Sequence, residues 1–270
     1  MNKTLLSGAF NVCFLFSYPL AAHEFWLMPD KFKLDSSGAA NQLVFRVGED
    51  FIGNIWAKRA ERTLTLMHYT KNHAFDLTPS TFQSDTIPIA LRFESEGTHL
   101  LAMESNNSFI SLEADKFNHY LKEDGNEAVY QWREKNGTAH VASRENYRRC
   151  AKTLVQVGTK TDDTFKRVLG MPLELIPLQN PYRLKQGDNL TVQVLFAGKP
   201  LTNKMILTWH KRTASDAAKP QTHYTDAKGL LTFPLTDTGD WMVSTVHLVP
   251  VENDPKADYQ SYWGNLTFGF

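Results

Sequence analysis

Histidine is the residue type in this sequence whose chemistry stands out, because the common catalytic signatures are missing. The chain contains no Gly-x-Ser-x-Gly, Gly-x-Gly-x-x-Gly, His-Glu-x-x-His or Cys-x-x-Cys motif. It contains nine histidines, most of them in polar connecting segments or on strand faces that point to solvent. Because imidazole is a common ligand of divalent transition metals, a metal site is the chemistry that these residues favour.

Two histidines lie where a predicted strand meets a rim of apolar side chains. His99 begins a strand just after the turn at Gly97, and His247 shares a strand face with Trp241 ahead of the acidic segment 252–254. A packed wall that fixes the imidazole ring favours metal binding. We therefore expect His99 and His247 as metal ligands, with satisfied histidines at the edge of the core as the alternative.

A third histidine, His23, follows a segment typical of a secretory signal. Lys3 gives a basic start, residues 5–20 form an apolar run, and Ala22 is a small residue before the cut. Cleavage after Ala22 is favoured, with a retained membrane anchor as the alternative. The sequence thus predicts a signal peptide over residues 1–22 and an exported protein that begins at His23.

Cleavage at this point would create a metal-chelating group. A free α-amine and an imidazole on one residue can close a six-membered ring around an ion through Nδ1. An α-amine of pKa ~7.8 must lose its proton, which costs about 1 kcal/mol at pH 7. That cost is small beside the roughly 10–16 kcal/mol apparent for tight protein zinc sites. We expect His23 as a ligand, although a histidine left at the cut by chance is the alternative.

Charge and cysteine content exclude several classes of protein. The residues after the predicted signal carry 28 Lys and Arg against 29 Asp and Glu. The composition therefore lacks the excess of positive charge that is typical of nucleic-acid-binding proteins. Loss of Cys13 with the signal leaves Cys150 alone and excludes an internal disulfide. Cys150 follows two arginines that could favour a thiolate, but a buried inert thiol is the commoner case.

The C-terminal part of the chain has the pattern of short strands. Leu190, Val192, Val194 and Phe196 alternate with other residues at the period of two expected of a strand with one inward face. With the runs near 173–176, 205–210, 222, 230–235, 241–249 and 262–270, this makes about seven strands in roughly 100 residues. That spacing predicts an immunoglobulin-like β-sandwich over residues 171–270.

Residues 23–170 predict a second β-rich domain with a short helical insert. Strands are expected at 42–47, 63–68, 89–93, 98–103 and 109–112. Phe117, Tyr120 and Leu121 recur at helical spacing before the stop at Gly125, and a second helix is expected over residues 127–135. The fold class is therefore mainly β, with two sandwich-like domains that meet near residue 170.

The segment from Ser143 is harder to interpret. Ser143 could cap a third helix that contains Tyr147, Cys150 and Leu154, whereas residues 153–157 could equally form a strand. Periodicity alone leaves both interpretations open.

Several motifs together resemble a known family. They are His23-Glu24-Phe25-Trp26-Leu27, the segment from Leu112 to Lys122, Glu145-Asn146-Tyr147, Pro172 to Pro177, Asn180-Pro181-Tyr182, Gly198-Lys199-Pro200-Leu201, Gly239-Asp240-Trp241 and Ser261-Tyr262-Trp263. In this order they are similar to an exported family of unassigned function that is described as the periplasmic component of cobalt and nickel uptake systems. The resemblance spans nearly the whole chain after the signal.

This resemblance implies a protein that binds nickel or cobalt and presents the ion to membrane components of an uptake transporter. It points to His23, His99 and His247 as ligands, with Asp258 as a further oxygen ligand or a turn residue. Copper or zinc would suit the same ligand types. Two alternatives stay open: a copper-dependent oxidative enzyme with an N-terminal histidine brace, and a metal-free adhesive or sugar-binding sandwich.

Overall fold

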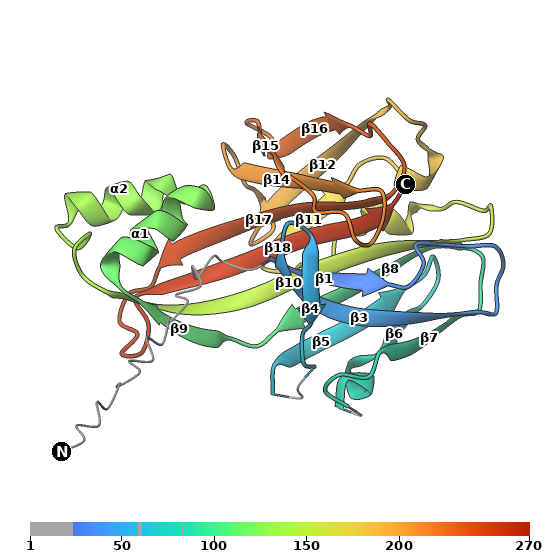
Figure 1. The fold of residues 1–270 in the computed structure, drawn as a ribbon, viewed down its shortest axis with the longest axis horizontal. Coiled ribbons are helices and arrows are strands. Elements are labelled where there is room, and N and C mark those ends of the chain that lie inside the picture. Colours follow the sequence, from blue (N-terminus) through green and yellow to red (C-terminus); the bar gives the residue numbers. More distant parts are fainter. Residues whose placement is uncertain (1–23, 59–60, 83) are drawn as a thin grey trace, which may run out of the picture.

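A large sheet forms the centre of the protein, as the computed structural model shows for residues 24–58, 61–82 and 84–270. Its ten described strands follow the order β15-β14-β17-β18-β10-β8-β5-β6, with β2 and β9 also paired to β10 (Figure 1). Their bounds are β2 (Lys33–Leu34), β5 (Thr63–Tyr69), β6 (Ala74–Asp76), β8 (Gly97–Ser105), β9 (Ser108–Leu112), β10 (Ser143–Val157), β14 (Met205–Lys211), β15 (Gln221–Tyr224), β17 (Asp240–Pro250) and β18 (Tyr259–Gly269).

Two smaller sheets cover the opposite faces of this central sheet. One consists of β1 (Glu24–Pro29), β3 (Ala39–Glu49), β4 (Ile52–Ile55) and β7 (Ile89–Phe93). The other consists of β11 (Leu173–Pro177), β12 (Asn189–Phe196), β13 (Lys199–Pro200) and β16 (Leu230–Pro234). Short 3₁₀ helices lie in the connections, namely η1 (Thr78–Phe82), η2 (Asp163–Lys166) and η3 (Pro181–Arg183). The predicted mainly β class, with sandwich packing, is confirmed.

The period of two along each central strand explains the two cores. In β8, Leu100 and Ala102 belong to the core shared with β11 and β12, whereas Leu101 and Met103 belong to the core shared with β1, β3 and β7. Successive side chains of a strand point to opposite faces, so one strand serves both cores. The two sandwiches therefore share their central sheet.

β10 joins the two halves of the chain and decides between the two interpretations of the segment from Ser143. Cys150 and Leu154 lie in one core while Ala151 and Val155 lie in the other, so the segment is a strand and not a helix. Burial of both faces produces an apolar run that hides the period of two. β10 also pairs in parallel with β18 over nine residues, so hydrogen bonds of the central sheet cross the expected junction near residue 170.

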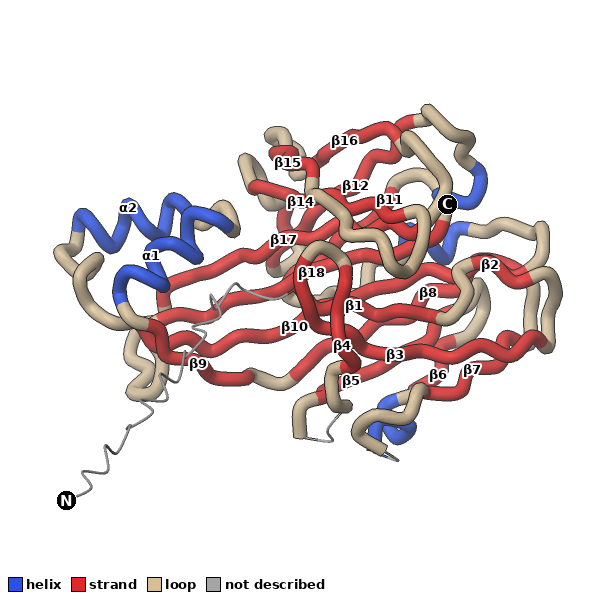
Figure 2. The backbone as a smooth tube through the Cα atoms, viewed as in Figure 1, coloured by secondary structure: helices blue, strands red, loops and turns tan. Residues whose placement is uncertain are grey.

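The helical insert is confirmed as α1 (Ala114–Glu123) and α2 (Glu127–Lys135). Figure 2 shows the pair at one end of the long central strands, in blue beside the red strands. Phe117 and Leu121 of α1 pack on Val246 and Leu248 of β17 and on Tyr259 of β18. In the part of the chain described here, neither helix has the length and apolarity needed to cross a membrane.

Candidate functional site

The histidines expected as ligands are not brought together by the described structure. His23 lies outside the described residues. His99 contacts Phe93 of β7 with ring centroids 4.8 Å apart, and His247 contacts Phe196 of β12 at 4.3 Å. Because β7 and β12 cover opposite faces of the central sheet, His99 and His247 point away from each other.

The strand register also gives their separation. His247 aligns through Tyr262 of β18 with Arg148 of β10, whereas His99 aligns with Val155 of β10. Seven residues along β10 and three strand spacings across the sheet place the two histidines about 27 Å apart. Ligand bonds of about 2.0–2.1 Å exclude one ion bound by both.

His99 is a core histidine whose two ring nitrogens are already used. Its Nε2 lies 2.9 Å from the carbonyl oxygen of Ser95, which can only accept, so we assign the proton to Nε2. Its Nδ1 lies 2.8 Å from Nε2 of His68, which therefore donates. Burial lowers the pKa of both rings, that of His68 to about 4. His99 thus has no lone pair left for a metal.

His247 is half-buried in β17. Burial, followed by the charge of Lys204, lowers its pKa to about 4, so the ring is neutral at pH 7. Its closest described aromatic contact is the edge of Phe196. Among the described residues, no group of three potential metal-ligand side chains includes His247.

A buried polar region at the start of β1 is the stronger candidate. Glu24, the first described residue, is only 9% exposed, and its Oε1 accepts a hydrogen bond of 2.9 Å from Ser244 of β17. Ser244 in turn accepts from Nε1 of Trp209 at 2.9 Å, which orients its hydroxyl hydrogen toward Glu24. Burial raises the pKa of Glu24 to about 7, against smaller effects of Ser244 and Arg149 in the other direction.

Arg149 of β10 is the cation beside this carboxylate. It is 8% exposed, lies over the ring of Phe25 at 4.8 Å, and has a buried Nη1 without a hydrogen-bond partner in the described part of the chain. Burial lowers the pKa of Arg149 to about 10, while Tyr147 and Glu24 act in the opposite direction. The guanidinium is therefore only partly compensated by its surroundings.

Asp124, at the end of α1, brings a second carboxylate to the same region. Its Oδ2 is buried and accepts no hydrogen bond from any described residue. Burial and then the Glu24 carboxylate raise the pKa of Asp124 well above its ordinary value, against the opposing effect of Lys204. Burial also lowers the pKa of Lys204 to about 7, which weakens the compensation that this lysine provides.

Glu145 of β10 supplies the third carboxylate. Its Oε1 accepts from Ser261 and, at 3.2 Å, from the hydroxyl of Tyr120, but its Oε2 has no described partner. Glu145 is 2% exposed, and burial raises its pKa to about 7. Burial, and then the charges of Glu145 and Asp124, raise the pKa of Tyr120, so this tyrosine lies within electrostatic range of both acids.

Glu24 and Glu145 are buried, Asp124 is half-buried with a buried Oδ2, and burial raises the pKa of all three carboxyl groups. Buried charges are costly unless they are paired or coordinate a metal. Among the described residues, no three His, Cys, Asp or Glu side chains already form a ligand group.

Motifs in the sequence could have pointed to part of this region. Glu24 and Glu145 both lie in motifs that carry the family resemblance, although no role was expected for either. Asp124 precedes the glycine that ends α1, where an acidic residue reads as an ordinary turn residue. Only the packing of α1 on the sheet places it near the other two.

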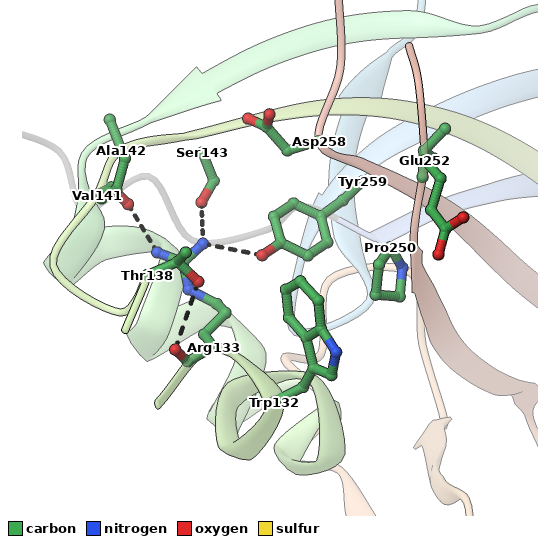
Figure 3. Close-up of a pocket in the computed structure, with 11 residues that line it drawn as sticks. Trp132, Arg133, Thr138, Val141, Ala142, Ser143, Pro250, Glu252, Asp258 and Tyr259 are labelled. Carbon is green, nitrogen blue, oxygen red and sulfur yellow. Dashed lines mark hydrogen bonds between the residues drawn. The ribbon is translucent and has the colours of Figure 1, made fainter. Parts of the chain in front are cut away.

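A separate pocket of about 490 Å³ lies between α2 and the ends of β17 and β18 (Figure 3). In its wall, Arg133 is 1% exposed and donates to Ser143, Tyr259 and the carbonyl of Val141. Asp258, considered above as an oxygen ligand, accepts from Nη2 of Arg144 at 2.8 Å and from its Nε at 3.2 Å. Both oxygens of Asp258 are engaged by an arginine, which argues against a metal role.

Comparisons with known proteins place the chain in a family. The sequence model of a domain of unknown function, DUF4198, matches residues 20–249. The chain belongs to this family. No curated protein matches it.

The similar solved structures are distant. One is a marsupial T cell receptor, 9% identical, with a TM-score of 0.21 and coverage of 90% of this chain and 73% of that chain. Another comprises three N-terminal domains of the Highly Immunogenic Outer Capsid protein (Hoc) of bacteriophage RB49. It is 11% identical, with a TM-score of 0.18, and the match covers 91% of this chain and 59% of that one. Scores this low carry no argument, so the site has to be interpreted from its own residues.

Proposed function

We propose that this protein is an exported, periplasmic protein that binds a divalent transition metal, nickel or cobalt, at its processed N-terminus. In this proposal the α-amine and imidazole of His23 form the chelate, and the acidic region at the start of β1 receives it. The bound ion is then presented to the membrane components of an uptake transporter. The function is metal binding and delivery, without a catalytic step.

The observation that carries the proposal is the buried carboxyl group of Glu24, which is 9% exposed and lies one residue after the predicted cleavage point. Oδ2 of Asp124 is also buried and has no hydrogen-bond partner among the described residues. Buried carboxyl groups of this kind can coordinate a metal ion. The region also lies one residue from the predicted cleavage point, whereas His99 and His247 lie elsewhere on the sheet.

The ligand types agree with this choice of ions without selecting one of them. An amine, an imidazole and carboxylate oxygens suit nickel, cobalt and zinc, and intrinsic affinity rises from cobalt through nickel to copper. Selection of nickel or cobalt would therefore depend on the supply of metal and on the transporter. The copper-dependent alternative needs a second imidazole beside the terminal one, and neither His99 nor His247 lies at the start of β1.

The test is to titrate the exported, processed protein with Ni²⁺ and with Co²⁺ and to measure the binding affinity by calorimetry. A variant with one alanine inserted before His23 keeps the imidazole but loses the terminal chelate, and a variant with alanine added at the C-terminus is the matched control. We expect the N-terminal insertion to weaken binding at least tenfold and the control to leave it unchanged. Equal affinities in all three proteins, or no binding by the processed protein, would refute the proposal.

A further inference from the structure

The pocket between α2 and the ends of β17 and β18 has an exposed aromatic side chain in its wall (Figure 3). Trp132 of α2 is 44% exposed, and Val141, which also lines the pocket, is 48% exposed. The cavity volume of about 490 Å³ falls within the roughly 300–1,000 Å³ of small-molecule sites. The pocket therefore has the size of a ligand site and an apolar surface on which a flat ligand can stack.

Arg133 determines the direction in which two hydroxyl groups of the wall can donate. Its Nη1 donates to the hydroxyl of Ser143 and, at 3.1 Å, to that of Tyr259, as drawn in Figure 3. Because a guanidinium carries donors only, both hydroxyl oxygens accept, and their own hydrogens have to point elsewhere. Ser143 is 1% and Tyr259 3% exposed, and no described residue accepts a hydrogen bond from either hydroxyl. Two buried donors are thus left for a ligand.

The wall that carries these hydroxyls is held rigidly by the same arginine. Nε of Arg133 donates to Oδ1 of Asn118 at 3.0 Å, and its Nη2 donates to the carbonyl oxygen of Val141 at 2.7 Å. The guanidinium also lies 4.9 Å from the ring of Phe117. One buried side chain therefore connects α1, α2 and the starts of β10 and β18. Such preorganisation lowers the entropic cost of binding a ligand.

Glu252 supplies an acceptor to the same pocket. It is an exposed residue that follows β17, and no described residue forms a hydrogen bond or an ion pair with its carboxylate. Asp258 differs, because both of its oxygens accept from Arg144. An ionised carboxylate can only accept hydrogen bonds. The pocket accordingly combines two buried donors, one anionic acceptor and an indole face.

This combination favours a neutral ligand that carries hydroxyl groups. A cation would meet two hydroxyl hydrogens with the Arg133 guanidinium behind them, and an anion would meet Glu252. A sugar ring suits both, because its hydroxyls donate and accept while its C–H face packs on an indole. We propose that this pocket binds a saccharide that stacks on Trp132, accepts from Ser143 and Tyr259, and donates to Glu252. This binding does not depend on the proposed metal site.

The test is to titrate ¹⁵N-labelled protein with cellobiose, lactose and maltose and to follow the NMR spectrum. We expect saturable shifts of the indole N–H of Trp132 and of the amides of residues 141–143 and 251–252. Trp132→Ala should weaken binding at least tenfold, whereas Trp132→Phe keeps an aromatic face and should retain most of the affinity. Tyr224→Ala removes an exposed aromatic side chain on β15, outside the pocket, and is the matched control. It should bind like the wild-type protein.

Loss of folding does not explain the expected result, because Trp132 is exposed on α2 and alanine favours the helix. No shift with any of the three disaccharides at about 20 mM would overturn the proposal. Equal affinity in Trp132→Ala would also overturn it. Stronger binding of tetramethylammonium or acetate at these residues would contradict the charge argument. Ni²⁺ binding is a separate measurement, so these outcomes leave the proposed function as it stands.

Discussion

The hydrogen-bonded pair of His68 and His99 makes the protein sensitive to acid in a way that can be measured. Nε2 of His68 donates to Nδ1 of His99 over 2.8 Å, and His99 donates from Nε2 to Ser95. Both rings must be neutral, because a proton on Nδ1 of His99 would set two donors against each other. Protonation of either ring therefore opposes the folded state.

The size and sign of the effect follow from the pKa of His68. Burial lowers this pKa from 6.5 in the unfolded chain to about 4 in the folded protein. Between these values the unfolded state binds more protons, so stability falls as the pH falls through this window. For one histidine the loss is about 2 kcal/mol between pH 7 and pH 5, and about 3.4 kcal/mol once the pH is well below 4.

The assay is urea unfolding of the metal-free protein at pH 7 and pH 5. In His68→Gln the side-chain amide can still donate to His99 but cannot titrate, and His140→Gln changes an exposed histidine as a control. We expect the wild-type protein and the control to lose about 2 kcal/mol more than His68→Gln between the two pH values. Buried carboxyl groups titrate in all three proteins, so this difference isolates His68. A difference below about 0.5 kcal/mol would refute the reasoning.

Two further predictions concern the buried core. Lys152 and Glu174 form an ion pair of 2.8 Å with both side chains 1% exposed, so Lys152→Met should cost about 3–5 kcal/mol in urea unfolding. Most of this loss should return in the double variant Lys152→Met with Glu174→Gln, and an equally unstable double variant would contradict the pairing. Cys150 is 1% exposed and burial raises the pKa of its thiol to about 12, so thiol reagents at pH 8 should label it only as fast as the protein unfolds. Rapid labelling of the native protein would contradict this.

Local patterns in the sequence determined much of the fold. The alternation from Leu190 to Phe196 predicted β12, and the stop at Gly125 predicted the end of α1. These patterns were sufficient because the period of a strand or helix depends on neighbouring residues. The same patterns did not decide between a helix and a strand for β10, because its apolar residues face two cores at once.

The candidate site depended on tertiary structure. His99 and His247 share a residue type and a position near a strand end, yet the register of four strands and the two faces of one sheet separate them. Glu24 and Asp124 share no local pattern, yet packing of β1 and α1 on the same face brings their charges into interaction. The sequence by itself determined which elements form and which residues can bind a metal. Which of those residues meet was decided by strand order and register, which depend on contacts between residues far apart in the chain.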